Sequence, residues 1–181
     1  MANAEIEGAR RSPWRAAGWG VAGLVLLVPL VAMQFTREVN WTVGDFLFAA
    51  MLLGLVGLTL DLTVRTSRNP SYRGGVGAAL AASFLIVWAN GAVGMIGNED
   101  NPYNLLFFGV IGVALLGSVL ARFRAAGMAL AMLVAAAAQA AIGVGGMTTD
   151  VRGGILSTLF AGLWLLSAAL FRNAARDGAN A

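Results

Sequence analysis

Long apolar blocks alternate with short polar connections along the whole chain. Six blocks stand out, at residues 16–35, 43–64, 74–96, 104–121, 125–147 and 153–171. Each block is close to the ~20 residues that a helix needs to cross a bilayer. Short connections make consecutive helices antiparallel. The pattern predicts an all-α integral membrane bundle of six transmembrane helices in three antiparallel hairpins, with an N-terminal tail at 1–15, a transmembrane domain at 16–171 and a C-terminal tail at 172–181.

The composition supports a membrane protein and narrows its chemistry. Hydrophobic residues make up 59% of the chain and charged residues 12%, against about 25% charged residues in an average soluble domain. The chain has no cysteine and no histidine, which removes disulfides, thiolate nucleophiles and imidazole metal sites. We therefore expect neither a cofactor nor a bound metal.

Arginine is distributed unevenly between the two ends of the predicted helices. If the helices alternate in direction, one side receives ten arginines and the other receives two, Arg37 and Arg152. The positive-inside rule then places both termini in the cytoplasm. The ten are scattered between apolar blocks, which argues against a nucleic-acid surface. They are Arg10, Arg11, Arg15, Arg65, Arg68, Arg73, Arg122, Arg124, Arg172 and Arg176.

A small and polar stripe interrupts the third apolar block. At 100° per residue, one face of a helix carries five of its small or polar residues, and that face should point into the bundle. Asn90 needs a hydrogen-bond partner there, either on another helix or on a ligand or ion. The three-residue spacing of the glycines favours close helix packing. The stripe consists of Ala79, Ser83, Asn90, Gly94 and Gly97.

The stripe leads into a polar segment with two interpretations. Four oxygen-bearing side chains follow one another in residues 98–101, including Glu99 and Asp100. They could form a turn in which Asn101 or Asn104 caps the fourth helix. Alternatively, their oxygens could bind a hard cation, although the spacing is not that of an EF-hand.

Two further polar residues could contribute to the same outward-facing pocket. Asp45 follows the potential cap Thr42 in the first turn of the second helix, at a depth similar to that of Asn90; it either stabilises the helix start or forms part of a site. Gln139 lies midway along the fifth helix and either bonds a neighbouring helix or lines a pathway. It shares a stripe with Met128, Met132, Gly143 and Gly146.

Basic residues at the other membrane surface have two possible roles. Arg73, Arg122 and Arg124 could contact anionic lipid headgroups or simply fix the orientation of the chain. Arg65 lies four residues after Asp61 on the second helix, so these two side chains can pair.

One part of the sequence resembles a known group of proteins. The segments "WTVGDF" and "WANGAVGMIGNEDNPYN" are similar to those of small multispanning membrane proteins of proteobacteria, a group without an assigned activity. The resemblance extends from about Trp41 to Arg124. It implies a bacterial inner-membrane setting and a shared core of helices two to four, and it carries no functional residue.

These observations leave two functional hypotheses. The first is a small transporter or channel-like protein whose outward-facing pocket is built from Asp45, Asn90, Glu99, Asp100 and Gln139. The second is a structural or accessory protein that binds lipids or another membrane complex, or forms a homo-oligomer, through its glycine-rich and alanine-rich faces. We do not expect an enzyme, because the serines have no histidine or lysine to activate them.

Overall fold

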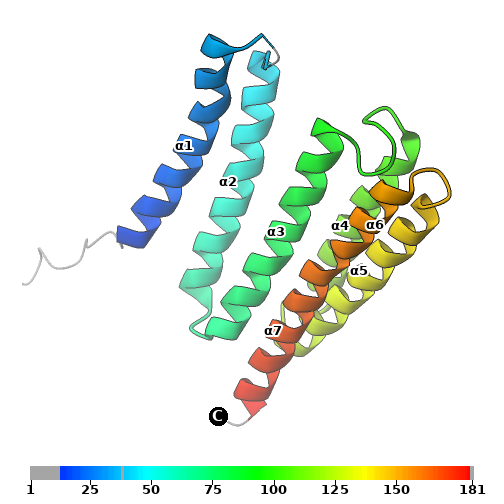
Figure 1. The fold of residues 1–181 in the computed structure, drawn as a ribbon. Helices are drawn as coiled ribbons and strands as arrows, with labels where there is room; N and C mark the ends of the chain where they lie inside the picture. The colour runs from blue at the N-terminus through cyan, green and yellow to red at the C-terminus, as the bar shows by residue number, and fades with distance from the viewer. Residues whose placement is uncertain (1–12, 38, 180–181) are drawn as a thin grey trace, which may run out of the picture. The chain divides into compact units, whose positions relative to one another are not determined.

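The computed structural model describes residues 13–37 and 39–179, and these residues form helices joined by short connections (Figure 1). Six helices are long and apolar enough to span a membrane, which indicates a multi-pass membrane protein. The helices are α1 Pro13–Phe35, α2 Val43–Thr66, α3 Pro70–Ala92, α4 Leu105–Leu120, α5 Ala125–Gly146, α6 Val151–Leu159 and α7 Ala161–Ala179, and a 3₁₀ turn, η2 Pro102–Asn104, precedes α4.

The chain divides into two compact units, Met1–Leu62 and Thr63–Ala181. In the first unit, the indole of Trp19 lies against Gly57, where a Cβ atom would be 2.9 Å from the ring. The second unit contains α3 to α7 and holds most of the buried apolar side chains. In this unit α7 packs against both α3 and α5, and α5 also packs against α4 and α6.

Glycines let the backbones of the second unit approach closely. A Cβ atom at Gly75 would lie 3.1 Å from the ring of Phe171, and one at Gly117 would lie 2.6 Å from the Cβ of Ala131. By contrast, Gly91, Gly109 and Gly112 have no such neighbour within 4 Å. Most glycines that recur at three-residue spacing therefore make no close helix contact. Close packing involves other glycines, such as Gly75 and Gly117.

The third helix ends earlier than its apolar pattern predicts. α3 stops at Ala92, and both Gly94 and Gly97 lie beyond it with φ near +75°. Glycine adopts this left-handed conformation without the steric cost that a Cβ atom brings. The prediction that these two glycines continue a helical stripe is therefore wrong: they are turn residues.

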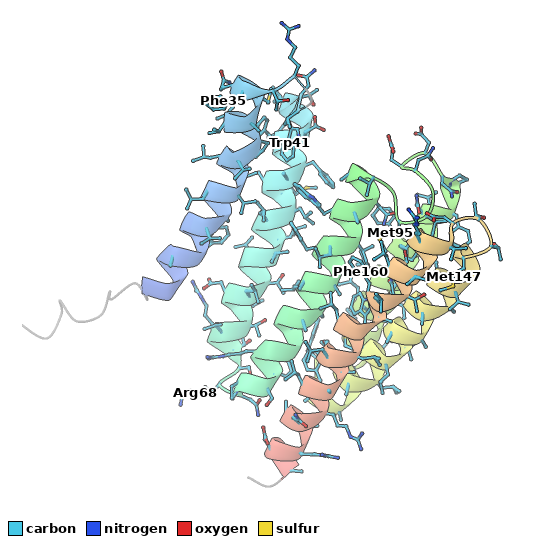
Figure 2. The ribbon with its side chains drawn as sticks, viewed as in Figure 1. Phe35, Trp41, Arg68, Met95, Met147 and Phe160 are labelled. Carbon is cyan, nitrogen blue, oxygen red and sulfur yellow. The ribbon has the colours of Figure 1, made fainter. Side chains whose placement is uncertain are left out.

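The sixth span is interrupted in the middle. The predicted block 153–171 covers parts of two helices, α6 and α7, which are separated by a turn at Phe160. The two helices follow one another along one line (Figures 1 and 2). α7 then continues past the apolar block to Ala179, through the predicted C-terminal tail. Together the two helices form one candidate span, Val151–Ala179.

Candidate functional site

The 93–104 loop, which connects α3 to α4, folds onto the ends of α5 and α6. Its residues Met95 and Ile96 are buried. Ile96 packs against Gly146 of α5, where an added Cβ atom would lie 2.5 Å from its side chain. The carbonyl of Met95 accepts a hydrogen bond from Ser157 Oγ of α6 at 3.2 Å. Figure 2 shows Met95 and Met147 at this end of the second unit. We call this the loop end of the unit.

Asn104 organises the loop from within. Its side chain accepts a hydrogen bond from the amide of Ile96 at 2.8 Å and donates to the carbonyls of Ile96 and Asn98 at 3.3 and 2.7 Å. Asn104 makes no capping bond to α4. Asn101 instead caps the 3₁₀ turn by accepting from the amide of Tyr103. The segment is therefore a turn that Asn101 caps, but neither asparagine caps α4 itself.

Asp150 clamps the loop to the start of α6. Its carboxylate accepts hydrogen bonds from the amide of Gly153 at 2.9 Å and from the amide of Gly97 at 3.0 Å. The bonds from Gly153 and Gly97, in that order, hold the pKa of Asp150 below its ordinary value. Hydrogen bonds to a carboxylate favour its charged form, so the clamp is ionised at neutral pH.

The acidic residues of the predicted pocket lie at the protein surface. Glu99 and Asp100 are both exposed at the tip of the loop. Among residues 13–37 and 39–179, no group of three or more acidic, histidine or cysteine side chains could hold a metal ion.

Asp45 belongs to the first unit and forms a reciprocal cap with Thr42. Its carboxylate accepts from the amide and the hydroxyl of Thr42 at 2.7 and 2.8 Å, and its own amide donates to the Thr42 hydroxyl at 3.3 Å. This arrangement satisfies donors that the start of a helix leaves unpaired. Asp45 therefore stabilises the start of α2, which is one of the two roles predicted for it.

Gln139 forms a hydrogen bond to the backbone beside the interruption between α6 and α7. It is fully buried, and Met128, Met132 and both glycines of its predicted stripe are buried as well. Its Nε2 donates to the carbonyl of Ser157 at 2.9 Å. In a continuous helix that carbonyl would accept from the amide of Ala161, the first residue after the break. The predicted interhelical bond is therefore present, and it caps a carbonyl at the break.

Asn90 uses its amide group differently from the expectation. Its Nδ2 donates to the carbonyl of Ile86 at 2.8 Å, one turn earlier in the same helix. The expected bond to another helix is therefore not made by this nitrogen. Its side chain is only 6% exposed, and its Oδ1 has no hydrogen-bond partner among the described residues.

In the second unit, as far as the structure describes it, two more buried polar atoms have no hydrogen-bond partner, Gln139 Oε1 and Trp164 Nε1. Trp164 is completely buried in α7. It shares a helix face with Phe171, seven residues after it in α7. That face meets α3, since Phe171 covers Gly75 and Ser167 donates to the Gly75 carbonyl at 2.7 Å.

Two residues of this region were not among those predicted from the sequence. Asp150 stands directly before the apolar start of the sixth span, as an N-cap aspartate would. Trp164 lies in the middle of a span, whereas membrane tryptophans concentrate at the interfaces. Both signals are readable in the sequence.

The arginines at the opposite end of the second unit have different surroundings. Arg65, Arg122 and Arg124 are exposed. Arg73 is half-buried, and its guanidinium donates to the carbonyls of Ser67 and Val64 at 2.7 and 2.8 Å. It therefore bonds carbonyls at and just beyond the C-terminal end of α2, which helices leave unpaired.

The unpartnered atoms lie on successive levels of the second unit. Asn90 is two residues from the end of α3, Gln139 seven residues from the end of α5, and Trp164 thirteen residues from the start of α6. At 1.5 Å per residue these offsets place the residues about 3, 10 and 20 Å from the loop end. The three residues thus lie at different depths in the apolar core of the second unit. Comparison with protein families, with curated proteins and with solved structures finds no match to this chain.

Proposed function

We propose that this protein is a small transporter or channel-like protein of the bacterial inner membrane that lets a small polar solute enter the second unit from the loop end. The observation that carries the proposal is that three buried polar atoms in the described part of the second unit, on Asn90, Gln139 and Trp164, have no hydrogen-bond partner. Burying an amide without a hydrogen bond costs roughly 1–3 kcal/mol in proteins. A solute that bonds these atoms removes that cost.

The interruption of the sixth span supports the same proposal. Many transporters bind their substrates beside helices that are broken within the membrane. Here the break follows Leu159, and Gln139 both bonds the α6 side of it and carries one of the unpartnered atoms. In this proposal the solute contacts Asn90, Gln139 and Trp164. The exposed residues Glu99 and Asp100 lie at the entrance.

Orientation follows from the arginine distribution. We place the 93–104 loop outside the cell and both termini in the cytoplasm, with the six spans in three antiparallel hairpins, because arginine accumulates on the side of the termini. The absence of native cysteine permits a direct test with Glu99→Cys and Arg176→Cys. A membrane-impermeant maleimide added to intact spheroplasts should label the first variant and should label the second only after lysis. The reverse result would contradict the orientation.

Solute passage is tested in liposomes that contain the purified protein. Light scattering should show faster entry of urea or glycerol than in protein-free liposomes. Asn90→Leu should slow this entry about tenfold, because losing one hydrogen bond worth about 1.4 kcal/mol in the crossing barrier has that effect. Ser83→Ala serves as the control, since the Ser83 hydroxyl donates to the carbonyl of Ala79 in its own helix. Protein-containing liposomes as tight as empty ones to urea, glycerol, water, Na⁺ and K⁺ would refute transport.

An accessory role is the second candidate, and a specific observation favours it. Several polar side chains of the loop end are bonded within the protein, including those of Asn104 and Asp150. Groups occupied in this way serve the fold and leave fewer contacts for a solute. Absence of flux together with a membrane complex that stays bound during purification would support this second role.

A further inference from the structure

The chemistry of the unpartnered atoms defines the class of solute, on the basis of the proposed function. Asn90 Oδ1 and Gln139 Oε1 are amide oxygens and accept hydrogen bonds, whereas Trp164 Nε1 carries an N–H group and can only donate. We infer that these three atoms select an uncharged solute that carries both donors and acceptors, such as urea, a small amide or a polyol, and that Trp164 determines this selectivity.

Each class of ion satisfies only part of the series. A cation such as K⁺ is bound well by amide oxygens, but it is repelled by the positive end of the indole N–H dipole. An anion has the opposite problem, because it accepts from the indole and is repelled by both amide oxygens. A neutral molecule with N–H or O–H groups and a carbonyl or hydroxyl oxygen can bond all three. Donors and acceptors along a pathway select in this way in other membrane proteins.

The charge of the surrounding core points to the same class. The buried polar side chains of the second unit, as far as the structure describes it, include no charged group; they are Thr63, Asn90, Asn104, Ser118, Gln139, Ser157 and Ser167. A charged solute in such a core would lose its hydration without gaining a counter-ion, which is far more costly than the transfer of a neutral molecule. The apolar neighbourhood therefore reinforces the choice made by the three polar atoms.

The position of Trp164 makes it the selective element of the series. Asn90 lies near the loop end and Gln139 lies deeper, so both acceptors are reached before the donor. Trp164 is the deepest of the three, at about 20 Å from the loop end. Its side chain is fully buried on the face of α7 that meets α3. A solute that bonds the indole N–H group at this level must present an acceptor, which a cation lacks.

The test uses the full-length protein in liposomes and compares four solutes, urea, glycerol, K⁺ and Cl⁻. Wild-type protein should raise the permeability of urea and glycerol, while both ions stay at the level of protein-free liposomes. Trp164→Phe keeps an aromatic ring and removes the N–H group, and it should lower urea and glycerol entry about tenfold, the effect of one lost hydrogen bond of about 1.4 kcal/mol. Trp88→Phe is the matched control, because Trp88 stacks on Phe84 outside the series.

The outcomes separate this inference from the proposed function. If no solute crosses, the proposed function fails and the inference fails with it. If K⁺ or Cl⁻ crosses as fast as urea, passage stands and the selectivity is wrong. Full urea entry through Trp164→Phe would likewise overturn the role of Trp164. Should that variant not fold, the four-solute comparison on the wild-type protein still decides the solute class.

Discussion

Replacing Gly154 with alanine should destabilise the second unit, because the added methyl group has no room there. A Cβ atom at this position would lie 2.5 Å from Met147 Cγ, 2.7 Å from the carbonyl oxygen of Gly143 and 2.8 Å from the amide nitrogen of Met147. Two of these three neighbours are backbone atoms, which cannot rotate away. We expect a loss on the order of 1–3 kcal/mol in the free energy of unfolding, measured by thermal or denaturant unfolding in detergent.

Gly162→Ala provides the matched control in the same span. Gly162 is exposed on α7, and a Cβ atom there would meet nothing within 4 Å. Alanine favours a helix over glycine by roughly 0.5–1 kcal/mol, so this variant should be as stable as the wild type or more stable. Equal stability of the two alanine variants would show that α5 and α6 do not pack through Gly143 and Gly154.

Asn104→Leu should release the 93–104 loop. Leucine has a similar size but leaves the amide of Ile96 and the carbonyl of Asn98 without the bonds that Asn104 gives them. A buried group deprived of its partner costs about 1–3 kcal/mol. Hydrogen exchange of residues 93–101, followed by mass spectrometry, should therefore become at least about tenfold faster, the equivalent of 1.4 kcal/mol.

Asn173→Leu is the corresponding control, because Asn173 is exposed on α7, remote from the loop end. Its exchange in residues 93–101 should match that of the wild type. Unchanged exchange in Asn104→Leu would mean that the bonds of Asn101 and Asp150 suffice to hold the loop, and that Asn104 is not its organising residue.

The apolar blocks predicted the spans well because a membrane span depends mainly on the length and hydrophobicity of one continuous segment. A helix that is to cross a bilayer needs about twenty apolar residues, and six helices of the structure meet this requirement. The stripe around Gln139 was also predictable, since every member of it is buried. Hydrophobic periodicity is a strong signal wherever one face of a long helix packs against others.

The loop end was predicted less well because backbone conformation decides it. Gly94 and Gly97 fit the periodicity of a helical face, but both adopt positive φ after α3 has ended. Asn104 is placed for a cap, yet it bonds a segment eight residues earlier. Such bonds depend on how a loop folds back on itself, and helical periodicity contains no information about that.

The break after Leu159 also could not be predicted from local sequence. No proline marks it, and glycines occur in this span at positions 153, 154 and 162, so Gly162 alone does not single out the break. What stabilises it comes from another helix, through the bond from Gln139 to the Ser157 carbonyl. Long-range contacts of this kind override local propensity.

This dependence ties two distant parts of the chain together. Without the side-chain amide of Gln139, the buried carbonyl of Ser157 would have no hydrogen-bond donor unless the sixth span formed one continuous helix. The side chain at position 139 is thus bonded to the discontinuity in a span that begins twelve positions later.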